Sequence, residues 1–101
     1  VFPNATVSEF GVIVQSDDSV HQIKAEIFAR GPVAAAINGK PLHTYLGVIY
    51  DDETQSTNTT HIVSIVGWGT TTKDGADPQP YWIVRNSWGQ CKYSILCCTV
   101  Y

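Results

Sequence analysis

Two residues in this sequence, His61 and Asn86, have the types and positions expected of a catalytic pair. His61 opens a strongly apolar stretch directly after a polar loop, and Asn86 closes a second apolar stretch just before Ser87-Trp88. If the two stretches pair as a hairpin, the start of the first lies near the end of the second. An Asn oxygen that accepts a ring N–H fixes the histidine tautomer and directs the other nitrogen at a nucleophile. Trp88, beside the pair, would shield that hydrogen bond from water.

A purely structural interpretation of the same residues stays open at this point. Asn86 could cap a turn, Trp88 could belong to the core, and His61 could be a strand-end residue without chemistry. The other two histidines, His21 and His43, lie in polar or turn surroundings, and we expect both to be solvated surface side chains.

The three cysteines, Cys91, Cys97 and Cys98, all lie near the C-terminal end of the sequence. Their odd number leaves at least one of them unpaired within this chain, and the sequence does not predict which two would pair. The sequence has neither a Cys-x-x-Cys pair nor a His-x-x-x-His spacing, so we expect no zinc site, and nothing indicates another metal or a cofactor.

The elements that would position these residues form an α+β pattern. Apolar residues at helical spacing predict one helix over about residues 19–29, which Gly31-Pro32 should end. Small and β-branched residues indicate a buried strand over 33–37. The strongest strand candidate is 61–69, followed by a turn-rich connection and a second strong candidate at 81–86. We therefore expect one helix followed by several antiparallel strands. The apolar residues 10–14 belong to a short extended segment near the N-terminus.

Composition restricts the classes of protein that fit. The chain has 101 residues, of which 44% are hydrophobic and 15% charged, as in a single globular domain. Because the charged fraction is low, we expect part of the surface to be apolar and covered by another domain. A net charge of −3 with scattered basic residues disfavours nucleic-acid binding. No apolar run approaches the length of about 20 residues that a membrane span needs.

Two short motifs bear on the cellular compartment. Asn4-Ala5-Thr6 and Asn58-Thr59-Thr60 are sequons that permit glycosylation in a secretory protein. The N-terminus has no signal-peptide pattern and no initiator Met, which is typical of a processed chain or a fragment.

The motifs together resemble the papain-like cysteine peptidases. THIVSIVGWG at 60–69 and YWIVRNSWG at 81–89 are similar to the His and Asn motifs of that family. IKAEIFARGPVAAAI at 23–37 and YLGVIYDDE at 45–53 are similar to its preceding region. Across residues 20–90 the resemblance is strongest to the cathepsin X (cathepsin Z) branch.

The resemblance implies a fold, an activity and a role for each motif residue. The fold is the strand-rich C-terminal lobe of a two-lobed peptidase, with the active site in the cleft between the lobes. His61 would be the catalytic imidazole, Asn86 its orienting partner and Trp88 the indole that covers them. The activity is hydrolysis of peptide bonds by a Cys-His-Asn mechanism, in a lysosomal or secreted protein whose substrates are peptides or proteins.

The sequence also departs from the family pattern. The nucleophilic cysteine of such peptidases lies roughly 130–150 residues before the His, and no Cys precedes His61 here. We therefore expect it on a missing N-terminal lobe, together with the glutamine of the oxyanion hole. Residues 1–90 form the peptidase-like part, and residues 91–101 form an atypical tail, interpreted as a variant ending or a shifted reading frame. Val48 replaces a glycine that is usual in the family.

Two hypotheses on function follow from this resemblance. In the first, the chain is part of a cysteine peptidase, in which case it would be inactive until joined to the Cys-bearing part. In the second, it is a truncated, catalytically inert homologue that acts as a protein-binding module. Carboxypeptidase activity of the cathepsin X type rests on the overall resemblance alone, because the loop that sets it lies outside this chain.

Overall fold

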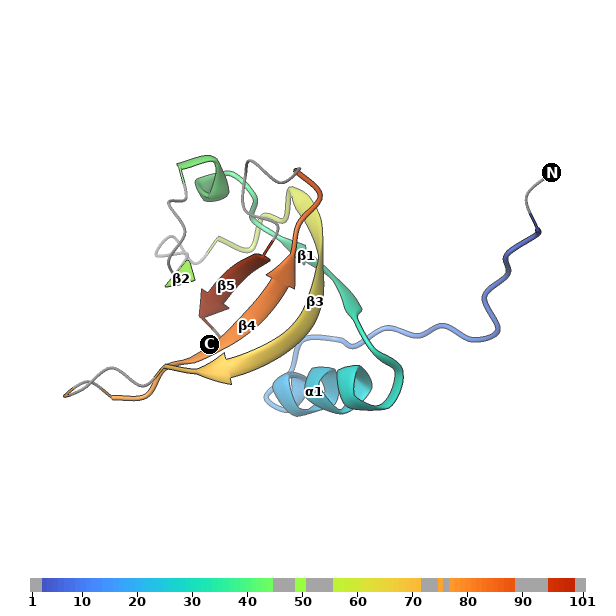
Figure 1. The fold of residues 1–101 in the computed structure, drawn as a ribbon, viewed down its shortest axis with the longest axis horizontal. Coiled ribbons are helices and arrows are strands. Elements are labelled where there is room, and N and C mark those ends of the chain that lie inside the picture. The colour runs from blue at the N-terminus through green and yellow to red at the C-terminus, as the bar shows by residue number, and fades with distance from the viewer. Residues whose placement is uncertain are drawn as a thin grey trace.

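The computed structural model describes residues 3–44, 49–50, 56–71, 75, 77–88 and 95–99. Within these residues, one α-helix precedes a five-stranded sheet (Figure 1), so the α+β class predicted from the sequence is confirmed. The elements in chain order are α1 (Ser19–Arg30), β1 (Val33–Ile37), the short 3-10 helix η1 (Pro41–Thr44), β2 (Ile49–Tyr50), β3 (His61–Thr70), β4 (Pro80–Arg85) and β5 (Ile95–Thr99).

Helix α1 begins and ends where its flanking residues favour a boundary. At its start, the Ser19 hydroxyl and backbone N–H both donate to the carbonyl oxygen of Ser16. At its end, Gly31 takes a φ of 101°, a conformation that residues with a side chain rarely adopt. The Gly31 N–H donates to the carbonyl oxygen of Ile27 and so satisfies one of the last helical acceptors. Pro32 follows and cannot continue the helix.

The sheet has the strand order β1-β3-β4-β5-β2. All its pairs are antiparallel except β2 with β5, which run parallel. Strand β5 lies in the tail after residue 90, for which the sequence predicted no element, and it pairs with β4 over its whole length. The C-terminal region therefore continues the sheet rather than leaving it.

Strands β3 and β4 form the hairpin on which the predicted site depends. Ser64 pairs with Arg85, and the register shifts between Ile65 and Gly67, which marks a β-bulge. Beyond the bulge, Gly69 pairs with Tyr81, and a Cβ on Gly69 would meet the Tyr81 hydroxyl oxygen at 2.5 Å. Gly69 therefore lets the Tyr81 ring lie directly across the strand.

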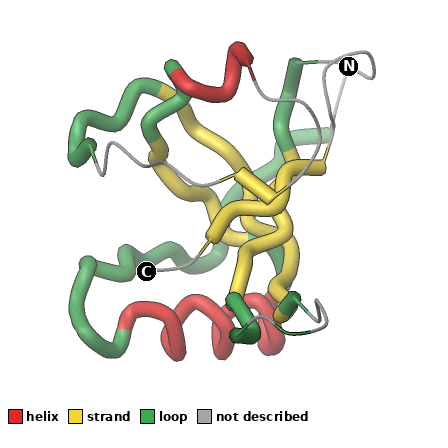
Figure 2. Tube along the Cα trace, turned by 90° about the vertical axis from the view of Figure 1, so that its left-hand side faces the viewer, coloured by secondary structure: helices red, strands yellow, loops and turns green. Residues whose placement is uncertain are grey.

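The core is small and lies against the middle of the sheet. Its buried members are Leu42 from η1, Val63 and Ile65 from β3, and Val84 from β4. No residue of α1 is fully buried, although Ile23 and Ile27 among others pack against this cluster. Helix α1 and η1 lie at opposite ends of the sheet in both views (Figures 1 and 2).

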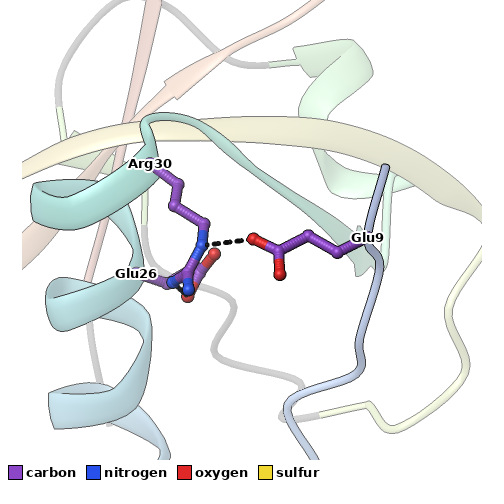
Figure 3. A network of polar contacts seen from close by, with 3 residues as sticks. All are labelled: Glu9, Glu26 and Arg30. Atoms are coloured by element: carbon purple, nitrogen blue, oxygen red, sulfur yellow. Dashed lines mark hydrogen bonds and ion pairs between the residues drawn. The ribbon is translucent and has the colours of Figure 1, made fainter. Parts of the chain in front are cut away.

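The N-terminal segment runs outside the sheet and extends away from the rest of the chain (Figure 1). Most of the apolar residues expected in an extended segment are solvent-exposed, with Phe10 96% and Val12 86% exposed, whereas Ile13 is half-buried. An ion pair ties the segment to α1: Arg30 donates to Glu9 at 3.0 Å, and within α1 it also donates to Glu26 at 2.9 Å. Figure 3 shows these three side chains. The hydrogen bond to Glu9 and the charges of both carboxylates raise the pKa of Arg30 above its ordinary value.

Candidate active site

His61 is fixed at the junction of a loop and a strand by backbone pairing. It is the first residue of β3 and pairs with Ile37 of β1. Just before it, the Thr60 N–H donates to the Ile37 carbonyl oxygen at 2.9 Å. Continuing the β3–β4 register one step beyond Ser64 and Arg85 puts Asn86 opposite Val63. Since alternate residues of a strand share a face, His61 lies on the same face as Asn86.

The structure brings the side chains of His61 and Asn86 together, with Nε2 of the imidazole 2.8 Å from Oδ1 of the amide. The same Oδ1 accepts the backbone N–H of Ser87, also at 2.8 Å. A backbone N–H can only donate, which identifies the shared atom as the amide oxygen, an acceptor. His61 Nε2 therefore carries the hydrogen and donates it to Asn86. In the neutral ring the other nitrogen, Nδ1, keeps its lone pair and can accept a proton.

Trp88 lies beside the imidazole of this pair. The ring centroids of His61 and Trp88 are 4.8 Å apart, with the ring planes tilted by 32°. Both His61 and Trp88 are half-buried, and the hydrogen bond between His61 and Asn86 is partly shielded from solvent. An apolar ring in this position keeps water from competing for the bond, which strengthens it.

His43 also belongs to this cluster, which sequence reasoning missed. Its side chain is exposed, as predicted, but its imidazole stacks on Trp88, with ring centroids 5.0 Å apart and planes only 13° from parallel. No pattern in the sequence indicates this contact, because His43 lies in a turn far along the chain from Trp88. His21, the third histidine, is exposed on α1.

A glycine backbone supports His61 from another side. Gly39 is buried, and a Cβ placed on it would lie 2.7 Å from the Cβ and 3.3 Å from the Cγ of His61. The Gly39 N–H donates to the Thr60 hydroxyl at 3.0 Å. The main chain can approach the imidazole this closely only because position 39 has no side chain.

The remaining predicted site residues lie elsewhere. Asn4 and Asn58, the sequon asparagines, are both exposed. Cys91 lies outside the described residues, as do Val48 and Gly89, whereas Cys97 and Cys98 are part of β5. Within the part of the chain that the structure describes, no three His, Cys, Asp or Glu side chains gather as a metal site would require. No helix among the described residues has the length and apolarity needed to cross a bilayer.

This arrangement is suited to moving protons at a reacting carbonyl. An imidazole whose tautomer is set by Asn86 can take a proton at Nδ1 from a nucleophile and return it to a leaving group. A half-buried ring of fixed orientation presents its second nitrogen in a defined direction, as such a role requires. The arrangement needs a nucleophile on the Nδ1 side to complete it.

Comparison with known proteins gives consistent results over most of the chain. A family model described as papain family cysteine protease matches residues 3–93. "Cathepsin Z" of Onchocerca volvulus is 40% identical over 84 residues, which cover 82% of this chain and 25% of that protein. "Probable cysteine protease RD19B" of Arabidopsis thaliana is 38% identical over 88 residues, which cover 85% of this chain and 24% of that protein.

A solved structure shares the fold as well. The crystal structure of SERA5E from Plasmodium falciparum superposes with a TM-score of 0.73 at 30% sequence identity and covers 84% of this chain and 34% of that one. The chain spans about a quarter of the length of the curated relatives it matches.

Proposed function

The chain belongs to the papain family of cysteine proteases, and from this premise we propose that it is the His- and Asn-bearing C-terminal part of a cysteine-type peptidase. The activity proposed is hydrolysis of peptide bonds by a Cys-His-Asn mechanism, with the cysteine on a segment outside this chain. The observation that carries the proposal is the 2.8 Å hydrogen bond from His61 Nε2 to Asn86 Oδ1, which leaves Nδ1 available.

In this mechanism each site residue has a defined task. Nδ1 of His61 takes the proton of the cysteine thiol and so generates the thiolate nucleophile. The sulfur attacks the peptide carbonyl carbon, and the imidazolium then protonates the nitrogen of the breaking C–N bond. The neutral ring next takes a proton from water, which attacks the thioester and releases the acid and the cysteine. Asn86 holds the ring orientation throughout, and Trp88 keeps water from the hydrogen bond between them.

Part of the chain's surface is apolar, as expected where another part of the protein covers it. Apolar side chains that a folded protein usually covers are exposed here: Val7, Phe10, Val12, Val14 and Phe28 are each at least 74% exposed. This apolar surface supports a further part of the protein that packs on the chain, and we place the cysteine on such a part.

The specificity proposed is that of a cathepsin X-like carboxypeptidase. It is supported by the identity of 40% to a protein named Cathepsin Z, and endopeptidase activity is the other outcome of a specificity test. We also propose a lysosomal or secreted location, which the exposure of both sequon asparagines supports.

The decisive experiment is activity by complementation. The chain is assayed for peptide hydrolysis alone and after mixing with the Cys-bearing N-terminal part of a close relative, with His61→Ala as the matched control. We expect hydrolysis only in the mixture, and none with the control. Peptides with a free and with an amidated C-terminus then separate carboxypeptidase from endopeptidase activity.

A folded chain that binds the N-terminal part without hydrolysis would overturn the catalytic proposal. The inert protein-binding module would then be the better account of the chain. Equal activity of the wild type and His61→Ala would overturn the role of the imidazole.

A further inference from the structure

We propose that His43 is a positioning residue of this site, one that holds the Trp88 indole in place over the hydrogen bond between His61 and Asn86. The proposal rests on the proposed function only for its kinetic readout. It starts from the near-parallel stack of His43 on Trp88, with centroids 5.0 Å apart, beside the contact of Trp88 with His61 at 4.8 Å.

Trp88 lies beyond the end of its strand, so the pairing of the sheet does not fix its position. Strand β4 ends at Arg85, so the indole lies three residues beyond the last ladder pair of that strand. A side chain on a bend after a strand is oriented by whatever packs against it. Among the described residues, the indole packs against the buried core cluster, and its ring contacts with His61 and His43 set how it lies over the imidazole.

His43 can support the Trp88 indole because hydrogen bonds and core packing hold the backbone that carries it. It lies in the support loop, residues 38–44, whose turn of 3-10 helix is closed by hydrogen bonds from Leu42 N–H to the Gly39 carbonyl oxygen and from the Thr44 hydroxyl to that of Pro41. The Leu42 side chain is only 6% exposed and anchors the loop in the core. His43 therefore stacks from a fixed backbone.

The same loop also touches His61, which links the two ends of the cluster. At its N-terminal end, Gly39 packs against the Cβ of His61 and donates its N–H to Thr60. At its C-terminal end, His43 stacks on Trp88. One short, hydrogen-bonded loop thus sets the positions of both the imidazole and the indole, and so the distance between them. Groups around a reacting centre must be held this way for catalysis to be efficient.

The test replaces the His43 ring and leaves Leu42, which anchors the support loop, unchanged. His43→Leu keeps a side chain of similar size but removes the flat ring, whereas His43→Phe keeps a ring that can stack. His21→Leu is the matched control, because His21 is an exposed histidine on α1. The first readout is the nuclear Overhauser effect between ring protons of His61 and Trp88 in the chain, and the second is the kinetics of the complemented peptidase.

We expect His43→Leu to weaken the His61–Trp88 Overhauser effect and to lower kcat about tenfold with KM changed less than about twofold. His43→Phe should restore both readouts to within about twofold of the wild type, and His21→Leu should change neither. An unchanged Overhauser effect and kcat in His43→Leu would overturn the proposal, as would a His43→Phe protein as impaired as His43→Leu. If the wild-type peptidase shows no activity, the proposed function fails, and the Overhauser effect still decides the role of His43.

Discussion

The imidazole of His61 donates from Nε2 to Oδ1 of Asn86 across 2.8 Å, and that oxygen also accepts the Ser87 N–H. The hydrogen bond from the Ser87 N–H matters because it holds the Asn86 amide in one orientation independently of His61. The backbone of Ser87 therefore sets the direction of the Asn86 oxygen. That oxygen in turn sets the orientation of the His61 imidazole, which donates to it. The relationship joins the start of β3 to the end of β4, so the hairpin register determines the geometry of the pair.

Removing the amide should impair catalysis more than folding. In the complemented peptidase we expect Asn86→Ala to lower kcat/KM by about 10- to 100-fold, because a ring free to rotate spends less time in the reactive orientation. Asn86→Asp, which keeps an acceptor oxygen, should lose less. Steady-state kinetics of the three proteins, with circular dichroism as a folding control, measures the difference. Equal kcat/KM for Asn86→Ala and the wild type would exclude an orienting role for this amide.

Strand β3 provides a matched pair of isoleucines for a test of the core. Ile65 is 6% exposed and belongs to the buried cluster, whereas Ile62 on the same strand is 63% exposed. Ile65→Ala should lower the free energy of unfolding by about 2–5 kcal/mol, because it removes buried methyl groups and leaves a cavity. Ile62→Ala should change it by no more than about 0.5 kcal/mol. Urea unfolding of both variants provides the comparison, and similar losses would contradict the assignment of faces.

The regular elements were largely predictable because their signals are local. The helix was expected over residues 19–29 and is found at Ser19–Arg30, since Gly31 and Pro32 mark its end in the sequence itself. Strands β1 and β3 lie within a residue of their expected ranges. Strand β4 runs from Pro80 to Arg85 instead of over 81–86, so Asn86 lies just beyond its end rather than within it. The pairing of β3 with β4, expected from two apolar stretches joined by a turn-rich connection, is present.

The rest of the site depends on contacts that no local pattern encodes. The stack of His43 on Trp88 joins a turn to a bend after a strand, and neither residue type at its position predicts the other. The close approach of Gly39 to His61 is equally non-local. Strand β5 was not predicted because its sequence has no family-like motif. In the structure it pairs with the edge of β4 that β3 leaves open. The residues at 10–14 are extended but unpaired, so apolar composition alone did not place them in the core.

Glycosylation tests the compartment independently of catalysis. Asn4 and Asn58 are both exposed, so an enzyme of the secretory pathway can reach them. When the chain is expressed with a secretion signal in eukaryotic cells, we expect a heavier protein that returns to the calculated mass after enzymatic removal of N-glycans. Asn4→Gln and Asn58→Gln should each remove one glycan. Asn58→Gln is preferable to a change at Thr60, whose hydroxyl accepts the Gly39 N–H. A secreted protein of unmodified mass would contradict this prediction.

Gly39 offers the sharpest test of how the site is supported, because the chain contains a matched control. In Gly39→Ala the added methyl group would lie 2.7 Å from the Cβ of His61, whereas a Cβ at Gly11 would meet nothing within 4 Å. We expect Gly39→Ala to lower the free energy of unfolding by about 1–3 kcal/mol through overpacking. Because the imidazole must move to relieve the contact, kcat should fall by about tenfold or more. Gly11→Ala should lower neither quantity. Thermal unfolding and kinetics of the two variants measure both effects, and a Gly39→Ala protein as stable and active as Gly11→Ala would show that the backbone at position 39 does not hold His61 in place.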